Sequence, residues 1–287
     1  MEPVVVGLIG AGPWARLAHA PMLAAGPHTR LGAVWARRPE AAEELSRGYG
    51  AAACATVHEL LGRVEAVAFA VPPNVQCELA VRAARAGRAL LLEKPLALSV
   101  EAARRLVAAV DESGVVSQVV LTNRYHPEVR SFLAEAAGFD AFGARAALVS
   151  GAFLGGDFAT PWRLEHGALL DLGPHVLDLL VAALGPVASI RATGDPRRWL
   201  GLTAVHESGA VSQAALSGAV PGARPPSIVE LYGPSGLREL AGPLDHRGTW
   251  ATVAAEFAAA VRAGRPGELD VHRGLMLQEL LDRAVRA

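Results

Sequence analysis

Short apolar runs alternate with longer amphipathic stretches along the first 121 residues. The run at 4–9 is rich in β-branched residues, which is typical of a strand buried on both faces. Similar runs lie at 31–36, 64–71, 89–92 and 115–121, and the stretches between them have the spacing of helices. Alternating strands and helices predict a doubly wound parallel sheet, whose ligands gather at the carboxyl ends of the strands.

From residue 122 the pattern changes to shorter apolar runs separated by turn residues. Segments 207–209 and 233–236 have the composition of hairpin turns. The pattern predicts a mostly antiparallel sheet in a second, α+β domain, completed by helices at 249–263 and 271–285. We therefore expect two domains, 1–121 and 122–287. The predicted strands of the second domain are 144–152, 187–193, 199–206, 210–217, 227–232 and 237–240.

The first strand runs into a glycine turn, Gly10-x-Gly12-x-x-Ala15, and then into a helix. Gly10 allows a tight turn, Gly12 lets a pyrophosphate approach the backbone, and the small Ala15 lets the helix pack on the strand. Free N–H groups at a helix start favour an anion. The context predicts a dinucleotide site; the alternative is a glycine turn that binds nothing.

The end of the second strand carries arginines where an NAD site has a carboxylate. An Asp or Glu there would bind the ribose 2′-hydroxyl, but the sequence has Ala36, Arg37 and Arg38. An acid would repel a 2′-phosphate, whereas an arginine can bind one through two parallel hydrogen bonds. The pair therefore indicates NADP in preference to NAD. The alternative is two solvated arginines before a helix.

Two further polar segments follow strand ends in the first domain, at 72–74 and at Glu93–Lys94. Partial burial beside a strand end could prepare Lys94 for proton transfer or for polarising a carbonyl. The alternative is a surface lysine that extends from the strand to solvent. The glycine turn, the arginine pair and these two segments share one edge of the predicted sheet, which supports a ligand site there.

A strongly apolar helix, predicted at 168–184, carries three polar residues on one face: Asp171, His175 and Asp178. Polar residues in such a setting need partners or a cavity. We expect Gly173–Pro174 to kink the helix and direct Asp171 and His175 at a ligand, with His175 as an acid or base beside a carboxylate. The alternatives are a buried His–Asp pair that satisfies itself and a metal site.

Composition narrows the class of protein. Apolar residues make up 52% of the 287 residues and charged residues 19%, which allows a large core. The formal net charge of −1 and the lack of charge blocks argue against nucleic acid or a membrane surface as the main partner. Two cysteines without a CxxC motif indicate neither a disulfide framework nor a zinc site, and no signal pattern is evident, so we expect a cytoplasmic protein.

Several motifs together resemble the glucose-fructose oxidoreductase, inositol dehydrogenase and rhizopine-catabolism family (Gfo/Idh/MocA), over nearly the whole chain. The resemblance implies an N-terminal Rossmann domain and a C-terminal domain with a large open sheet, often used for dimer or tetramer contacts. It implies NAD(P)-dependent redox chemistry on a secondary alcohol or ketone of a sugar, sugar derivative or cyclitol. The motifs are Gly10-Ala11-Gly12, Pro72-Pro73, Glu93-Lys94-Pro95, Pro161-Trp162-Arg163 and the segment 167–178 with Asp171 and His175.

By motif position, Lys94 would contact the reacting oxygen and the nicotinamide ribose, and His175 would be the general acid or base. Asp171 would support His175 or bind a substrate hydroxyl, and Tyr125 and Arg163 complete the expected substrate contacts. No metal ligand is expected. The expected cofactor contacts are Gly10, Gly12, Pro13, Trp14, Ala15, Ala36, Arg37, Arg38, Val71, Pro72, Pro73, Asn74, Gln76, Glu93, Lys94, Trp162 and Arg163.

Three positions depart from the family pattern: Gln76 stands where histidine is frequent, Ala36 where an acid is, and His166 where the first glycine of a Gly-Gly pair is. None removes an expected catalytic residue. We expect an NADP-dependent dehydrogenase or reductase that assembles as a homodimer or homotetramer through its C-terminal sheet. Two other functions stay open. One is a non-catalytic NADP-binding sensor. The other is a reductase of a nonsugar imine or enal, since aromatic residues, which could stack on a sugar, make up only 5%.

Overall fold

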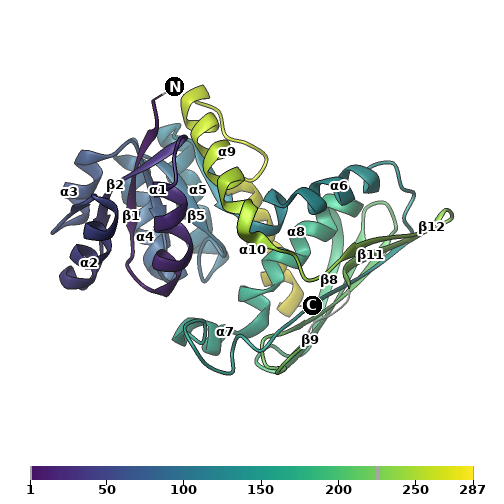
Figure 1. The fold of residues 1–287 in the computed structure, drawn as a ribbon. Coiled ribbons are helices and arrows are strands. Elements are labelled where there is room, and N and C mark those ends of the chain that lie inside the picture. The colour runs from purple at the N-terminus through teal and green to yellow at the C-terminus, as the bar shows by residue number, and fades with distance from the viewer. Residues whose placement is uncertain (1, 224–226, 287) are drawn as a thin grey trace. The chain divides into compact units, whose positions relative to one another are not determined.

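The computed structural model describes residues 2–223 and 227–286. Its contacts divide the chain into two compact units. Unit 1 comprises Met1–Val120 and Trp250–Met276, and unit 2 comprises Leu121–Thr249 and Leu277–Ala287. Each unit is built around one six-stranded sheet (Figure 1). The expected outer domain limits, 1 and 287, lie outside the described residues.

The structure differs from the expectation of an uninterrupted second domain, because residues 250–276 pack on unit 1. Gln118 Nε2 donates to the Val253 carbonyl at 3.1 Å, and the Val271 N–H donates to Ser117 Oγ at 3.2 Å. The apolar pattern of these helices showed that they are amphipathic, but not which sheet they cover. The helices are α9 (Thr249–Ala263) and α10 (Val271–Arg286), and the division between the units falls inside α10.

The sheet of unit 1 is parallel throughout, in the order β3-β2-β1-β4-β5-β6. Because crossover connections are right-handed, the reversal of strand order at β1 and β4 places the helices on opposite faces and opens a crevice at the carboxyl ends of these two strands. The predicted doubly wound sheet is confirmed. The strands are β1 (Val4–Ile9), β2 (Thr29–Trp35), β3 (Ala52–Ala53), β4 (Ala66–Phe69), β5 (Ala89–Glu93) and β6 (Ser117–Val120).

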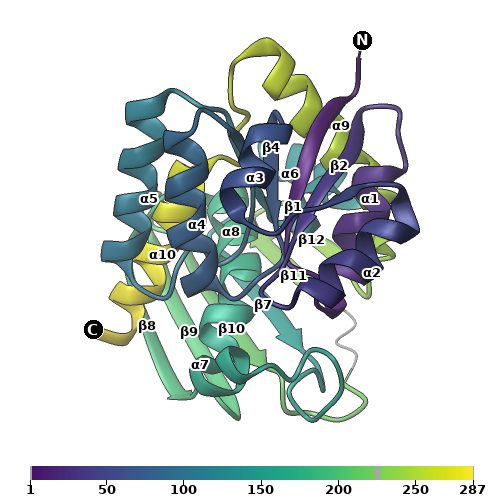
Figure 2. The same cartoon turned by 90° about the vertical axis from the view of Figure 1, so that its left-hand side faces the viewer.

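The helices of unit 1 alternate with these strands along the sequence, and α4 and α5 lie side by side (Figure 2). The first helical segment begins as a wide π-helical turn, η1, which continues into α1. The helices are η1 (Ala15–His19), α1 (Ala20–Ala24), α2 (Pro39–Tyr49), α3 (Val57–Arg63), α4 (Pro73–Arg85) and α5 (Val100–Ser113).

The sheet of unit 2 has the order β12-β11-β7-β10-β9-β8, and only the β7–β10 pair is parallel. This confirms the predicted mostly antiparallel sheet. Alternate residues of β9 are buried and accessible, as expected of a sheet with one covered face. The strands are β7 (Gly143–Val149), β8 (Val187–Asp195), β9 (Trp199–His206), β10 (Val211–Ser217), β11 (Ser227–Gly233) and β12 (Gly236–Ala241).

Helices α6, α7 and α8 contact this sheet, and the short helix η2 contacts α6 and α8. His206, which ends β9, is buried between the Gly185 carbonyl at 2.8 Å and Ser212 Oγ at 2.9 Å. Burial lowers the pKa of its imidazole, and the hydrogen bond to the carbonyl opposes that shift. The helices are η2 (Thr122–Tyr125), α6 (Pro127–Ala136), α7 (Pro161–Asp171), α8 (Gly173–Leu184) and η3 (His246–Gly248).

The apolar segment predicted as one kinked helix is two helices, α7 and α8, which meet at Leu172. A second break lies at Gly167, whose φ of +69° and approach to the Pro196 carbonyl exclude a side chain. Gly167 is the second residue of the pair in which His166 replaces a glycine, so the position that requires glycine retains it. The stretch Pro161–Leu184 is long and apolar enough to cross a membrane, but 72% of its most apolar window is buried, as in a core helix.

Candidate functional site

The glycine turn of unit 1 contains two glycines that are needed for different reasons. Gly10 has a φ of +117°, and a Cβ there would lie 2.4 Å from the Ala70 carbonyl oxygen, so the fold itself requires glycine. At Gly12 the backbone is not in the left-handed region, and an added Cβ would meet no described atom within 4 Å. The protein's own packing therefore does not explain Gly12. A ligand that approaches the backbone would explain it, which is how a pyrophosphate fits this turn.

Arg37 and Arg38 follow β2 and are exposed, and neither guanidinium has a hydrogen bond or ion pair with another described residue. Beside them, Arg16 of η1 forms a two-pronged ion pair with Glu44 of α2 at 3.0 and 2.9 Å. The pKa of Glu44 is lowered by this hydrogen bond and by the positive charges of Arg16, Arg47 and Arg38. The end of β2 thus has a positive potential and two side chains available to an anion.

The sequence-predicted residues of unit 1 lie where four neighbouring strands end. Gly10 follows β1, Arg37 follows β2, Pro72 and Asn74 follow β4, and Lys94 follows β5. Pro72 and Asn74 are exposed, whereas Ala15 and Pro73 are buried in the packing of their helices. The predicted common edge is therefore present in the structure.

Lys94 is the only lysine in the sequence. Of the 27 Lys and Arg residues in the sequence, all but this one are arginines. Arginine serves equally well wherever only a positive charge or an ion pair is needed, but its guanidinium does not deprotonate and is larger than an ammonium group. The single lysine, at the end of β5, is therefore a candidate for a role that needs an amine. The lysine count is visible in the sequence alone and points to the same residue as the Glu93–Lys94 motif.

Gln76 and Glu93, both expected at the cofactor, form hydrogen bonds with other residues of unit 1. Gln76 is fully buried, its Oε1 accepts from the Glu93 N–H at 2.8 Å and its Nε2 donates to the Glu93 carbonyl at 2.7 Å. Glu93 Oε1 accepts from Trp14 Nε1 at 2.7 Å and contacts His19 Nε2 at 2.8 Å. His19 is fully buried and belongs to this network through its contact with Glu93. Its position in the sequence alone indicates no role.

In unit 2, the break between α7 and α8 separates Asp171 from His175. Asp171 ends α7 and is buried, and Arg163 Nε donates to its Oδ1 at 3.1 Å. The Arg163 guanidinium also lies over the Trp162 ring, 4.8 Å from its centroid. His175 is half-buried in the first turn of α8. Arg163 is thus committed to Asp171, and the pair forms a locally neutral unit.

Asp178, predicted to share a face with Asp171 and His175, is the partner of a buried arginine. Its two carboxylate oxygens lie 3.2 and 3.3 Å from Arg124 Nη1, and its side chain is 1% exposed. Tyr125, the expected substrate contact next to Arg124 in η2, is also 1% exposed. Breaking such a buried ion pair is costly, so Asp178 anchors η2 to α8.

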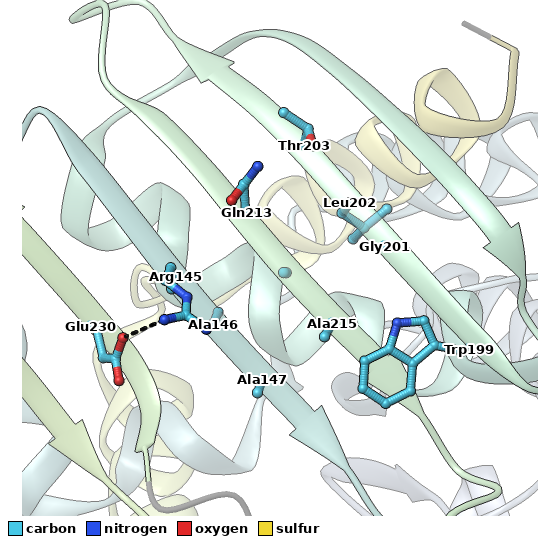
Figure 3. Close-up of a pocket in the computed structure, with 11 residues that line it drawn as sticks. Arg145, Ala146, Ala147, Trp199, Gly201, Leu202, Thr203, Gln213, Ala215 and Glu230 are labelled. Carbon is cyan, nitrogen blue, oxygen red and sulfur yellow. Dashed lines mark ion pairs between the residues drawn. The ribbon is translucent and has the colours of Figure 1, made fainter.

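The open face of the unit 2 sheet carries a shallow hollow of about 440 Å³ over β7, β9 and β10 (Figure 3). Its floor consists of small residues such as Ala147, Gly201 and Ala215, and the exposed Trp199 ring stands at one end. Arg145 and Glu230 form an ion pair of 4.0 Å at the opposite side. Among the described residues, no group of three or more His, Cys, Asp and Glu side chains could hold a metal ion.

A family model described as "Oxidoreductase family, NAD-binding Rossmann fold" matches residues 4–121. Residues 4–121 therefore resemble the NAD-binding Rossmann domain of the Gfo/Idh/MocA oxidoreductase family. A dTDP-3,4-didehydro-2,6-dideoxy-alpha-D-glucose 3-reductase of Streptomyces violaceoruber is 30% identical over 191 residues, 65% of this chain and 56% of the relative. A UDP-N-acetylglucosamine 3-dehydrogenase of Acidithiobacillus ferrooxidans is 31% identical over 193 residues, 66% of this chain and 57% of the relative.

These alignments span little more than half the length of the curated relatives. The similarity to solved structures extends further. GenD2 from gentamicin A biosynthesis, solved in complex with NAD, is 26% identical with a TM-score of 0.87, and the match covers 100% of this chain and 94% of that chain. A levoglucosan dehydrogenase in complex with NADH and L-sorbose has a TM-score of 0.85 at 19% identity, covering 99% and 96% of the two chains, which shows a common fold.

Proposed function

We propose that the chain is an NADP(H)-dependent oxidoreductase that interconverts a secondary alcohol and a ketone of a sugar, sugar derivative or cyclitol. The observation that carries the proposal is the position of the only lysine, which follows β5 at the same sheet edge as a glycine turn open to a ligand. Relatives whose names specify sugar or inositol substrates support the substrate class. A bound nicotinamide would accept or supply the hydride.

The residues at the edge of unit 1 fit such a cofactor. Gly12 leaves room for a pyrophosphate beside the backbone, and the exposed Arg37 and Arg38 supply donors for a 2′-phosphate. The absence of a carboxylate at Ala36 removes the group that would repel that phosphate. This set supports NADP over NAD, although the family as a whole is described as NAD-binding.

Lys94 and His175 are proposed to act on the reacting oxygen. In reduction, the Lys94 ammonium stabilises the negative charge that develops on the carbonyl oxygen, and His175 donates a proton to it. In oxidation, His175 removes the hydroxyl proton. Asp171 is proposed to bind a substrate hydroxyl or to orient His175; its ion pair with Arg163 holds its carboxylate in place for either role.

The proposal is tested by cofactor titration followed by a turnover screen. Binding of NADPH and NADH is followed by protein fluorescence. Turnover is followed by nicotinamide absorbance with UDP-N-acetylglucosamine, myo-inositol and levoglucosan as alcohols and L-sorbose as a ketone. Turnover of one of these that is lost in Lys94→Met, with NADPH binding retained, supports the proposal. Unchanged turnover in Lys94→Met contradicts it, and NADPH binding without any turnover would favour a non-catalytic sensor.

We propose further that a second copy of the chain covers the open face of the unit 2 sheet. The shallow hollow over small residues, with the exposed Trp199 beside it, offers a flat and partly apolar surface (Figure 3). Light scattering of Trp199→Asp and Ala215→Glu tests this. Both should shift a dimer or tetramer toward monomer, and an unchanged mass in both would contradict the use of this face. We also propose a cytoplasmic location, with no nucleic-acid or membrane partner.

A further inference from the structure

The side chain of Gln76 completes the unit 1 sheet at the strand end that precedes Lys94. Along β5, Ala89, Leu90 and Leu91 pair with residues of β4, but β4 ends at Phe69 and the chain then turns into α4. Glu93 therefore extends past the end of its neighbour on that side. On the other side it still pairs with Val120 of β6.

The Gln76 carboxamide takes the place of the missing strand. Its oxygen accepts the Glu93 N–H at 2.8 Å and its nitrogen donates to the Glu93 carbonyl at 2.7 Å, so both main-chain polar groups of Glu93 are bonded to this one side chain. The same nitrogen lies 3.3 and 3.4 Å from the carbonyls of Pro95 and Leu96. Gln76 thus binds the main chain before and after Lys94.

The Glu93 side chain fixes the same residue from another direction. Its Oε1 accepts the indole N–H of Trp14 and contacts His19 Nε2, and the carboxylate is 13% exposed. The Nδ1 atom of His19 is buried without a hydrogen-bond partner in the described part of the chain. The ring proton therefore belongs on Nε2, which donates a hydrogen bond to the Glu93 carboxylate. Trp250 packs edge-on against Trp14, with the ring centroids 5.5 Å apart.

We propose that Gln76 and Glu93 are positioning residues that fix the main chain from which Lys94 extends, and that neither binds the cofactor. The inference rests on the proposed role of Lys94. The main chain at Glu93 is held by Gln76 on one side and pairs with β6 on the other. Because Lys94 is the next residue, this restricts the positions that its amine can reach. Misplacing a catalytic group by about 1 Å can cost about a hundredfold in rate, whereas the glycine turn and the arginines proposed to hold most of the cofactor follow other strands, β1 and β2.

The test compares two buried glutamines of unit 1. Gln76→Ala removes the bonds to Glu93. Gln118→Ala is the matched control, because Gln118 is also buried and its Nε2 also donates to a main-chain carbonyl, that of Val253, outside the Glu93 network. We expect both variants to lower the melting temperature, but only Gln76→Ala to lower kcat, by about tenfold or more, with the Kd of NADPH within about threefold.

The single lysine provides a readout that needs no substrate. Reductive methylation with isotope-labelled formaldehyde gives one dimethyl-lysine NMR signal, at Lys94, besides that of the α-amino group. In Gln76→Ala this signal should move toward the position of an unstructured lysine, and in Gln118→Ala it should stay in place. Glu93→Gln keeps an oxygen that can accept from Trp14 and His19, so it should retain more of the wild-type signal position and kcat than Glu93→Ala.

The possible results separate clearly. Equal losses of kcat in Gln76→Ala and Gln118→Ala would reduce Gln76 to general stability and overturn the inference. A rise in the Kd of NADPH as large as the fall in kcat would make Gln76 a cofactor contact and also overturn it. An unmoved Lys94 signal in Gln76→Ala overturns it even if no substrate in the screen is turned over. If Lys94→Met keeps its turnover while Gln76→Ala moves the signal, the proposed catalytic role fails and the positioning stands.

Discussion

Removal of the Arg37 guanidinium is expected to weaken NADPH binding much more than NADH binding. Arg37 is exposed and has no hydrogen-bond or ion-pair partner among the described residues, so nothing in the protein has to be broken before it binds a phosphate. A hydrogen bond between charged groups contributes about 1.5–3 kcal/mol, and solvent exposure places this site at the lower end. Since about 1.4 kcal/mol is tenfold in affinity, we expect about a tenfold loss for Arg37→Ala and about a hundredfold loss for the double variant with Arg38→Ala.

The assay is the Kd of each cofactor, measured by fluorescence titration at two ionic strengths. NADH affinity should change by less than about twofold in these variants, and the NADPH advantage of the wild type should shrink at high salt because exposed charges are screened. Arg47→Ala, at the far end of α2, is the matched control for loss of one positive charge, and Ala36→Asp should shift the preference toward NADH. Equal losses for NADPH and NADH, or equal effects of Arg37→Ala and Arg47→Ala, would refute the assignment of the arginines.

Three further predictions concern the turn, the core and the carboxylate. Gly10→Ala should lower the free energy of unfolding by about 1–3 kcal/mol in urea titrations, because the Gly10 backbone is left-handed. Gly12→Ala should leave stability nearly unchanged and abolish NADPH binding. The reverse result would contradict this division of roles between the two glycines. The pKa of His206 is lowered by folding, so the unfolded chain binds the extra proton and stability should fall as pH drops below about 6.5; His206→Asn should flatten this dependence in thermal melts. Arg163→Met should destabilise by about 3 kcal/mol, because it removes a cation that pairs with the buried Asp171 carboxylate, and Arg163→Met with Asp171→Asn should recover part of the loss.

The sequence was sufficient for the parts of the fold that depend on local pattern. Buried strands and a glycine turn are recorded in consecutive residues, so the parallel sheet of unit 1 and the common edge of its candidate residues could both be predicted. The second sheet was predictable for the same reason, since β9 alternates strictly between buried and accessible residues. The parallel pairing of β7 with β10 was not, because strand neighbours distant in sequence leave no local trace.

Partners of polar side chains were the part that the sequence could not supply. The face that carries Asp171 and Asp178 was evident from helical spacing, but the partners of these residues were not. Arg124, the partner of Asp178, comes from η2, and Arg163 reaches Asp171 across the break at Gly167. Gln76 was expected at the cofactor because of its motif position. Its bonds to the Glu93 main chain were not predictable, because they occupy the place beyond Phe69 where β4 ends, and the predicted strand ran to residue 71. Residues 250–276 were assigned to the second domain because amphipathicity does not identify the sheet that a helix covers.

The kcat of Lys94→Arg, measured with a substrate that the wild type turns over, tests the central claim most directly. The variant keeps the positive charge but replaces an amine by a guanidinium that is larger and does not deprotonate. Loss of a group that stabilises developing charge on an oxygen typically costs about a hundredfold or more in rate. We predict a loss of that size with the Kd of NADPH within about threefold of the wild type. A Lys94→Arg variant that retains wild-type kcat would contradict the account.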